Sequence, residues 1–168
     1  MQELDKALGI SLVGEQREDV IIEFRRQLSD WDQSMPDVQP LVLDFGLGCF
    51  DEVGLVEAWI CNEVDAGYCG KYLFLFDGQT CPMHRHRVKS ETFFIARGAV
   101  EVCLDGEIRV LREGDTLFIE PWLPHSMKGL GPALILEIST PCLVDDNYFE
   151  NTEIPIGGNY GGGALESA

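Results

Sequence analysis

From residue 41 onward, the sequence is a succession of short apolar runs bounded by glycine, aspartate or asparagine. Runs such as KYLFLF, ETFFIA and ALILEIS alternate with turn signals such as FDG, LDGE and REGD. Many short strands at this spacing are typical of an all-β sandwich or barrel. The stretch CLDGEIRVL predicts a tight hairpin, with Asp105 and Gly106 at the turn. We therefore expect residues 41–154 to form one all-β domain.

The first forty residues have a different pattern, and we expect residues 1–40 to form a helical extension. Between residues 3 and 31, apolar side chains recur at the spacing of one helical face: Val20, Ile21, Phe24, Leu28 and Trp31. The two prolines of SMPDVQP then end helical structure. Several of the strands that follow are apolar on both faces, which suits cover by these helices on the outside, or by a second subunit.

Charge and composition narrow the classes of partner. The 168-residue chain has a net charge of −17, which repels phosphate backbones and anionic lipid, so we expect neither nucleic acid nor a membrane surface as partner. No apolar stretch approaches the roughly 20 residues that span a bilayer, and the start of the chain does not resemble a signal peptide. The six cysteines form no CxxC pair, which favours reduced thiols in the cytoplasm. Residues 155–168 form a glycine-rich tail.

The stretch CPMHRHRVKSETFF contains two of the three histidines of the chain. Because side chains alternate along a strand, His84 and His86 point the same way, and Arg85 between them points the other way. Glu91 follows a four-residue loop and can return to the same pocket, and His125 is the third histidine. All three histidines belong to one pattern, which predicts four ligands of one metal ion.

The spacing of these residues resembles the two sequence motifs of the cupin superfamily. The first motif is carried by Gly78, His84, His86, Glu91 and Gly98, and the second by Gly114, Pro121 and His125. The piece between proline and histidine departs from the usual form. The resemblance implies a cupin-type double-sheet β-barrel (jelly roll), with the metal in its mouth and the N-terminal helices packed outside. Three imidazoles and a carboxylate suit a divalent metal such as Mn²⁺, Fe²⁺, Co²⁺, Ni²⁺ or Zn²⁺.

A longer resemblance, over about residues 41–154, is to the D-lyxose isomerase family of small cupins. It is carried by LDFGLGCFDEVGL, YCGKYLFLFDGQTCPMHRH, the following ETF, and LEIST. The family consists of metal-dependent aldose–ketose isomerases, usually Mn²⁺-dependent and dimeric. The resemblance therefore implies an isomerase of a free sugar, of the D-lyxose/D-xylulose or D-mannose/D-fructose type, that forms a homodimer. It assigns the metal ligands to His84, His86, Glu91 and His125.

Isomerisation moves a hydrogen between C1 and C2, so a carboxylate beside the metal has to carry the proton. Glu137 is the candidate catalytic residue, because it is the only charged residue in the apolar run ALILEIS. The resemblance places Lys71 in the pocket, where its ammonium group would stabilise oxyanion charge. We expect Lys71 and Glu137 to contact the sugar, together with an acidic residue of the segment after the last strand, Asp146 or its neighbour Asp145.

Three points stay open in the sequence. An Fe(II) cupin dioxygenase and a non-catalytic sugar-binding cupin are alternative functions for the same ligand set. The particular sugar is also open, because Glu153 stands where the family carries an arginine. Arg85, Arg87 and Lys89 form a basic cluster, for which we expect a solvated or interface role. A neutral sugar is therefore favoured over a sugar phosphate.

Overall fold

The computed structural model describes residues 2–158 of the chain, and the remaining residues are outside this description. The predicted tail at 155–168 lies largely outside the described residues. The elements are α1 (Gln2–Leu8), α2 (Gly14–Asp30), β1 (Leu41–Leu43), β2 (Leu55–Glu63), β3 (Tyr68–Leu75), β4 (Thr80–His86), β5 (Glu91–Arg97), β6 (Ala99–Leu104), β7 (Glu107–Arg112), β8 (Thr116–Ile119), β9 (His125–Gly129), β10 (Ala133–Ser139), a 3-10 helix (Val144–Asp146) and β11 (Asn147–Phe149).

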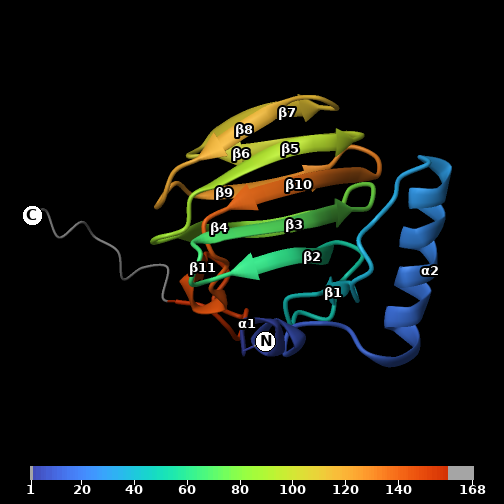
Figure 1. Cartoon of the computed structure of the whole chain (residues 1–168), viewed down its shortest axis with the longest axis horizontal. Coiled ribbons are helices and arrows are strands. Elements are labelled where there is room, and N and C mark those ends of the chain that lie inside the picture. The colour runs from blue at the N-terminus through green and yellow to red at the C-terminus, as the bar shows by residue number, and fades with distance from the viewer. Residues whose placement is uncertain (1, 159–168) are drawn as a thin grey trace, which may run out of the picture.

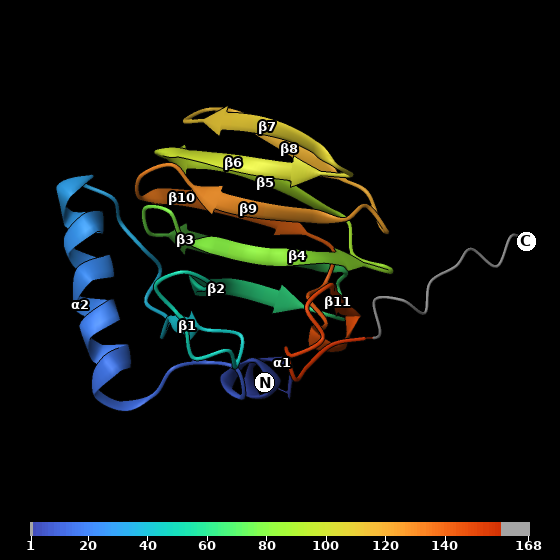
Figure 2. The ribbon, with the colours of Figure 1, turned by 180° about the vertical axis from the view of Figure 1, so that it is seen from behind.

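The strands form two sheets that face each other across one core. One sheet has six strands in the order β1-β2-β3-β10-β5-β8, and the other has five in the order β11-β4-β9-β6-β7. All the ladders within these sheets are antiparallel. Figures 1 and 2 show the two layers from opposite sides, with α2 beyond one end of the strands and β11 near the other. This architecture confirms the predicted double-sheet β-barrel.

The predicted hairpin is present between β6 and β7. Leu104 pairs with Glu107, and the two residues between them, Asp105 and Gly106, have φ values of 49° and 81°. Positive φ at both central positions defines the type I′ turn, whose twist matches that of the flanking strands. The predicted hairpin and the position of its turn are therefore confirmed.

The N-terminal region is helical, as expected, and forms two helices, α1 and α2. Residues 9–13 separate the two helices, and within them the backbone of Ser11 forms a bridge to Leu43 of β1. The amide of Leu12 donates to the carbonyl of Val42 at 2.8 Å, so these residues satisfy their backbone groups against the sheet. Helical periodicity alone does not show such a competing strand-like contact.

Helix α2 packs on the outer face of the six-stranded sheet. Its buried side chains are Ile21, Phe24 and Leu28, as the helical spacing predicts. They form a second apolar cluster with side chains on the outer face of the sheet, among them Phe74 of β3 and Leu134 of β10. The rings of Phe24 and Phe74 meet edge to face, with centroids 5.1 Å apart. Helix α2 therefore covers part of the outer face of these strands, while Ile138 of β10 and Phe94 of β5 stay exposed on it.

Helix α1 has a different position, at the end of the sandwich beside β1 and β11 (Figure 1). Ala7 of α1 and the following Ile10 are buried in the main core between the sheets. The part of the chain that the structure describes contains no helix with the length and apolar character needed to cross a bilayer. All six cysteines are free thiols. The boundaries at residues 40 and 154 stay predictions.

We predict that Phe24→Ala lowers the free energy of unfolding by about 3–5 kcal/mol, because it leaves a cavity between α2 and the sheet. Ile22 is on the same helix, and 62% of its surface is exposed, so Ile22→Ala is the matched control and should change stability by less than about 0.5 kcal/mol. Urea unfolding followed by circular dichroism measures both. Equal losses in the two variants would contradict the docked position of α2.

Candidate metal centre and pocket

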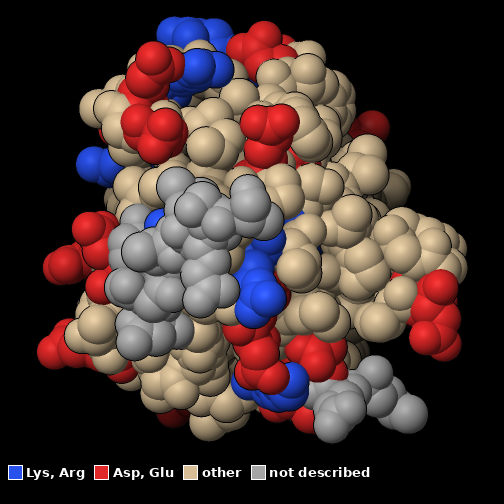
Figure 3. All heavy atoms as spheres, turned by 90° about the vertical axis from the view of Figure 1, so that its left-hand side faces the viewer, with Lys and Arg blue, Asp and Glu red and all other residues tan. Residues whose placement is uncertain are grey.

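The three histidines meet at one end of the barrel. His84 and His86 occupy alternate positions of β4, and His125 begins β9, where it is the direct cross-strand partner of His84. All three are buried, and their candidate ligand atoms lie within 4.8 Å of one another. The strand alternation expected from the sequence is therefore present, with both β4 imidazoles on the inner face. Figure 3 views the left-hand side of Figure 1, where acidic side chains are spread over the surface.

Backbone hydrogen bonds fix the orientation of the three rings. Each Nδ1 lies against a carbonyl oxygen, which can only accept, so each Nδ1 carries a proton and each Nε2 of the neutral ring has a free lone pair. The Nδ1 partners are Pro82 O for His84 at 2.8 Å, Asp146 O for His86 at 3.2 Å and Leu123 O for His125 at 2.9 Å. This is the arrangement by which proteins orient metal-binding histidines.

Glu91 adds a carboxylate to the same point. Its Oε1 lies 2.8 Å from Nε2 of His125 and 3.4 Å from Nε2 of His86. Within residues 2–158, neither Oε1 of Glu91 nor Nε2 of His125 has a hydrogen-bond partner, although both atoms are buried. Two buried acceptors this close are unfavourable unless a cation or a shared proton lies between them. Three imidazole nitrogens and one carboxylate oxygen therefore fit a divalent transition metal.

Burial and neighbouring charge keep these groups in the protonation state that a metal requires. Burial lowers the pKa of His84 well below its ordinary value, and the two neighbouring histidines lower it further. Burial and the nearby Lys89 ammonium also lower the pKa of His86. Burial alone would raise the pKa of Glu91, but Lys89 and the histidines outweigh burial and hold it well below its usual range. His84 and His86 are therefore neutral, and the Glu91 carboxylate is ionised, near neutral pH.

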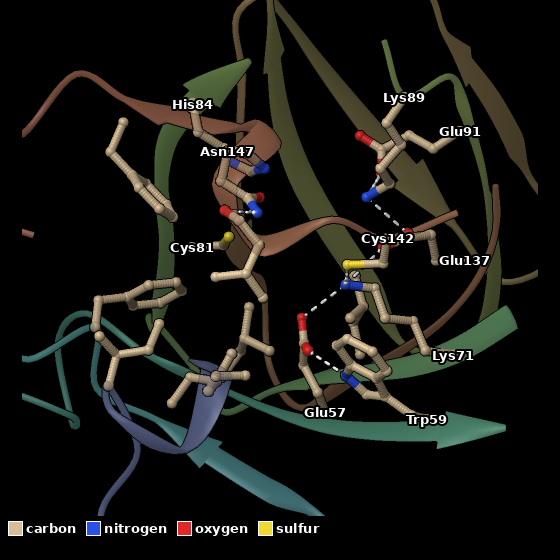
Figure 4. A pocket seen from close by; sticks show the side chains of 18 of the residues that line it. Glu57, Trp59, Lys71, Cys81, His84, Lys89, Glu91, Glu137, Cys142 and Asn147 are labelled. Carbon is tan, nitrogen blue, oxygen red and sulfur yellow. Dashed lines mark hydrogen bonds and ion pairs between the residues drawn. The ribbon is translucent and has the colours of Figure 1, made fainter. Parts of the chain in front are cut away.

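A chain of buried ion pairs extends from Glu91 across the inner face of the six-stranded sheet. Lys89 Nζ lies 2.6 Å from Oε2 of Glu91 and 2.8 Å from Oε1 of Glu137. Lys71 Nζ lies 3.3 Å from the other oxygen of Glu137 and 2.9 Å from Glu57. Figure 4 shows these side chains side by side along one wall of a pocket. The five groups alternate in sign, so each buried charge has an opposite neighbour.

The register of the paired strands determines the positions of most side chains in the ion-pair chain. Glu137 of β10 is the direct partner of Lys71 of β3 and of Phe93 of β5, so these three side chains form a row on the inner face. Trp59 of β2 continues the row beside Lys71. Its indole NH donates to Glu57 at 2.7 Å, which gives the last carboxylate a second donor. Glu137 and Lys71, the predicted catalytic residues, are therefore next to each other inside the pocket.

Lys89 lies in the pocket and not on the surface, so the solvated or interface role expected for this member of the basic cluster is wrong. Only 3% of its surface is exposed. Burial alone would lower the pKa of Lys89, but Glu137 and Glu91 outweigh burial and raise it, so the side chain is an ammonium group. It comes from the loop between β4 and β5, whose path strand alternation does not predict. Arg85, in contrast, points away from the histidines as expected.

Asp146 anchors the loop that carries Lys89. Its carboxylate accepts hydrogen bonds from the backbone amides of Arg87, Val88 and Lys89, at 3.0 to 3.3 Å. Its own carbonyl accepts from His86. These contacts support a positioning role for Asp146, and direct contact with a sugar stays a prediction. Its neighbour Asp145 is on the surface, where it pairs with Lys6 of α1.

An aromatic stack on the outer face supports the same segments. The Arg85 guanidinium lies 5.1 Å from the centre of the Trp122 ring. The centres of the Trp122 and Tyr148 rings are 5.6 Å apart. Trp122 has a φ of 69°, which is rare for a bulky residue, and its amide donates to the carbonyl of His86 at 2.6 Å. The departure from the usual cupin motif before His125 therefore corresponds to a tryptophan that ties this loop to β4.

Sequence reasoning missed Glu57, Trp59, Lys89 and Cys142 as residues of the pocket. The signal for Glu57 was present, because it is a carboxylate within the apolar run LVEAWI, as Glu137 is within ALILEIS. Cys142 Sγ lies 3.9 Å from Lys71 Nζ, and burial raises the pKa of its thiol. No local pattern marks Cys142 or Lys89, since both depend on how loops return to the barrel.

We predict that the metal-free protein loses stability as the pH falls below about 6.5. The unfolded histidines bind protons there, whereas the lowered pKa values of His84 and His86 keep the folded ones neutral. The unfolded state then holds more protons, so the free energy of unfolding falls by up to about 1.4 kcal/mol per pH unit for each of the two histidines. Urea unfolding of chelator-treated protein between pH 8 and 5.5 measures the slope. His84→Gln should lower the slope of the free energy of unfolding against pH by about the contribution of one histidine. An unchanged slope in that variant would contradict the assignment.

Two family models match overlapping parts of the barrel. Residues 75–139 match the model described as Cupin domain, and residues 37–105 match the model described as D-lyxose isomerase. A curated D-lyxose/D-mannose isomerase of Thermosediminibacter oceani is 43% identical over 72 residues, which are 39% of this chain and 39% of that protein. The chain thus matches about two fifths of the length of this curated relative.

Solved structures share the fold. The L-ribose isomerase of Cellulomonas parahominis has a TM-score of 0.67 at 16% identity, over 86% of this chain and 95% of that one. An RmlC-like cupin from Shewanella frigidimarina has a TM-score of 0.53 at 21% identity, over 65% of this chain and 89% of that one. At such identities the likeness is one of fold. The two-sheet barrel and the solved structures show a cupin-type fold, and over parts of its length the sequence resembles both the cupin domain family and the D-lyxose isomerase family.

Proposed function

We propose that this protein is a metal-dependent aldose–ketose isomerase that acts on a free sugar of the lyxose or mannose type. The observation that carries the proposal is the position of Glu137, a buried carboxylate linked through Lys89 to the carboxylate of the histidine cluster. Isomerisation needs a cation site next to a group that can carry a proton. The match to the D-lyxose isomerase model and the curated D-lyxose/D-mannose isomerase support the sugar class.

The charge balance of the pocket suits this reaction. The ion-pair chain contains three carboxylates and two ammonium groups, which leaves one excess negative charge. A divalent cation among the histidines would change this to one excess positive charge. The transition state of aldose–ketose isomerisation has the character of an enediolate, which carries negative charge. Its charge would then be compensated inside a site with little water, where such compensation is strongest.

Four members of the ion-pair chain have a role in the proposed reaction: Glu137, Lys71, Lys89 and Glu91. Glu137 takes the proton from one of the two reacting carbons and returns it to the other. Lys71 and Lys89 hold the Glu137 carboxylate from both sides, and they place positive charge beside the developing oxyanion. Ser139 Oγ donates to Glu137 Oε1 at 3.0 Å and further fixes its orientation. A divalent metal held by His84, His86, Glu91 and His125 would polarise the sugar carbonyl.

The metal, assembly and cellular location are part of the same proposal. We propose Mn²⁺ as the native ion, which the nitrogen and oxygen ligand set accommodates. We also propose a homodimer in the cytoplasm, as the family resemblance implies. Six free thiols agree with a reducing compartment.

The direct test uses Mn²⁺-loaded protein and a panel of free aldoses in deuterated water. We expect ketose formation together with deuterium at the exchanged carbon, detected by NMR. Absence of turnover on every free aldose and ketose would overturn the proposal. Oxygen uptake by Fe²⁺-loaded protein would favour a dioxygenase, and saturable sugar binding without either reaction would favour a sugar-binding cupin.

We predict that Glu137→Gln lowers kcat by about 10²- to 10⁴-fold, because the amide cannot take the proton. The same variant should still bind Mn²⁺, which calorimetry measures and which shows that the barrel is intact. Glu113→Gln changes a carboxylate that is 57% exposed and paired with Arg97 at the surface, so it is the control and should keep normal turnover. A near-normal rate in Glu137→Gln would remove this residue as the proton carrier.

We predict that His125→Ala weakens Mn²⁺ binding by more than about 100-fold, since loss of a ligand exceeds the 10- to 100-fold cost of losing a supporting group. Turnover should fall in parallel. Metal content after dialysis, measured by mass spectrometry, checks the first effect independently of activity. Retention of one ion per chain by this variant would show that the histidine cluster is not the metal site.

A further inference from the structure

The pocket beside the histidine cluster has two chemically different sides. One side carries the ion-pair chain from Glu91 to Glu57. The other side includes a group of apolar side chains, which we call the apolar wall: Ile10, Leu43, Phe45, Phe149 and Ile156. Two polar side chains, those of Asn147 and His84, also line the pocket. In Figure 4 the labelled charged side chains lie together on one side, and unlabelled hydrocarbon side chains lie opposite them. A molecule that fills this pocket therefore meets charge at one end and hydrocarbon at the other.

The apolar wall is assembled from segments far apart in the sequence. Ile10 follows α1, Leu43 ends β1, and Phe149 ends β11. The rings of Phe45 and Phe149 meet edge to face, with centroids 5.6 Å apart. Ile156, from the segment after β11, packs against the same cluster and is only partly buried. None of these five side chains has a group that can donate or accept a hydrogen bond.

We infer that the preferred sugar is a terminally deoxygenated aldose, whose last carbon is a methyl group and not a hydroxymethyl group. This inference rests on the proposed function, because it needs C1 and C2 to lie near Glu137 and the histidine cluster. With the reacting carbons held at the charged side, the far end of the sugar points to the apolar wall. A methyl group gains from contact with this wall, whereas a hydroxyl group there loses its hydrogen bonds to water.

The size of the expected preference follows from how such pockets discriminate. An apolar pocket does not strongly exclude a substrate that only adds a hydroxyl group, and the discrimination is on the order of 10²-fold at most. We therefore expect kcat/KM for a deoxy sugar to exceed that of its hydroxylated parent by about 10- to 100-fold. The effect should appear mainly in KM, because the terminal carbon is distant from the reacting bond.

The experiment compares matched pairs of sugars that differ only at the last carbon. We would measure 5-deoxy-D-lyxose against D-lyxose and 6-deoxy-D-mannose against D-mannose, with Mn²⁺-loaded protein. Higher kcat/KM for the deoxy member of each pair would support the inference. Turnover of the parents equal to or better than that of the deoxy sugars would overturn it and leave the proposed isomerase standing. Absence of turnover with all four would instead count against the isomerase itself.

A variant can move the preference in a direction that a structural defect cannot. Ile156→Thr places a hydroxyl group on the apolar wall at a partly buried position, where the barrel should tolerate it. We expect the deoxy-to-parent ratio of kcat/KM to fall by about tenfold. Ile138→Thr makes the same change next to Glu137 on β10, but this side chain is 57% exposed and faces outward, so the ratio should stay constant.

Phe149→Tyr is a second variant with the same expectation, because it adds a hydroxyl group within the wall without shortening the side chain. The Phe149 ring also lies 5.5 Å from the ring of His84, so the Mn²⁺ affinity of this variant has to equal that of the unaltered protein for the comparison. Thermal unfolding and Mn²⁺ binding confirm that each variant is folded. A lower ratio in both wall variants, with the ratio of Ile138→Thr unchanged, would support the assignment. An unchanged ratio in folded Ile156→Thr and Phe149→Tyr would overturn the apolar wall as the determinant of specificity.

Discussion

A charged group inside a protein is tolerated only when opposite charges and hydrogen bonds replace the water it has lost. This requirement controls the inner face of the six-stranded sheet. Glu57, Lys71, Glu137, Lys89 and Glu91 alternate in sign, and each one contacts the next. Removing Lys71 or Lys89 would leave Glu57 or Glu91, respectively, buried without its ammonium partner, which costs several kcal/mol, about 3 to 5. The five side chains therefore form one unit, although they come from four strands and a loop.

The histidine cluster is the end of this unit and not a separate feature. Oε2 of Glu91 belongs to the ion-pair chain, whereas Oε1 faces the bare nitrogen of His125. The chain carries an odd number of charges, so its excess negative charge lies in a region without water. A divalent cation at the histidines would reverse the sign of this excess charge and would separate the two acceptors. Lys89 pairs with both Glu91 and Glu137, so a change of charge at the histidine cluster also changes the electrostatic potential at Glu137, the proposed proton carrier.

The sequence was informative wherever a short-range rule decides the structure. Two-residue alternation places His84 and His86 on one face, and the Asp105-Gly106 pair sets a type I′ turn. Helical spacing identified the face of α2 that packs on the sheet. A carboxylate in an apolar strand marked Glu137, and its position inside the pocket agrees with that interpretation. These features depend on residues that are close in sequence.

Features that depend on long-range closure were not predictable in the same way. Strand alternation directs Arg85 away from the histidines, and a solvated or interface role was therefore predicted for the whole basic cluster, Lys89 included. Its burial depends on the carboxylate of Asp146, which is 57 positions away in the chain and holds the loop amides. The break between α1 and α2 likewise depends on β1, which supplies backbone partners for residues 10–12. Each of these outcomes is set by a contact between segments that no local pattern connects.

The same long-range contacts make the N-terminal extension part of the site. Glu3 of α1 accepts a hydrogen bond from the amide of Val144 at 2.6 Å, and Lys6 pairs with Asp145. Both contacts hold the 3-10 helix that contains Asp146, and Asp146 in turn holds the loop that delivers Lys89. Ile10 closes the pocket on its apolar side.

Exclusion of water strengthens every ion pair in the chain, because charges interact more strongly in a medium of low dielectric constant. Residues that precede the barrel in sequence thus control both the position of a charge beside Glu137 and the medium in which that charge acts.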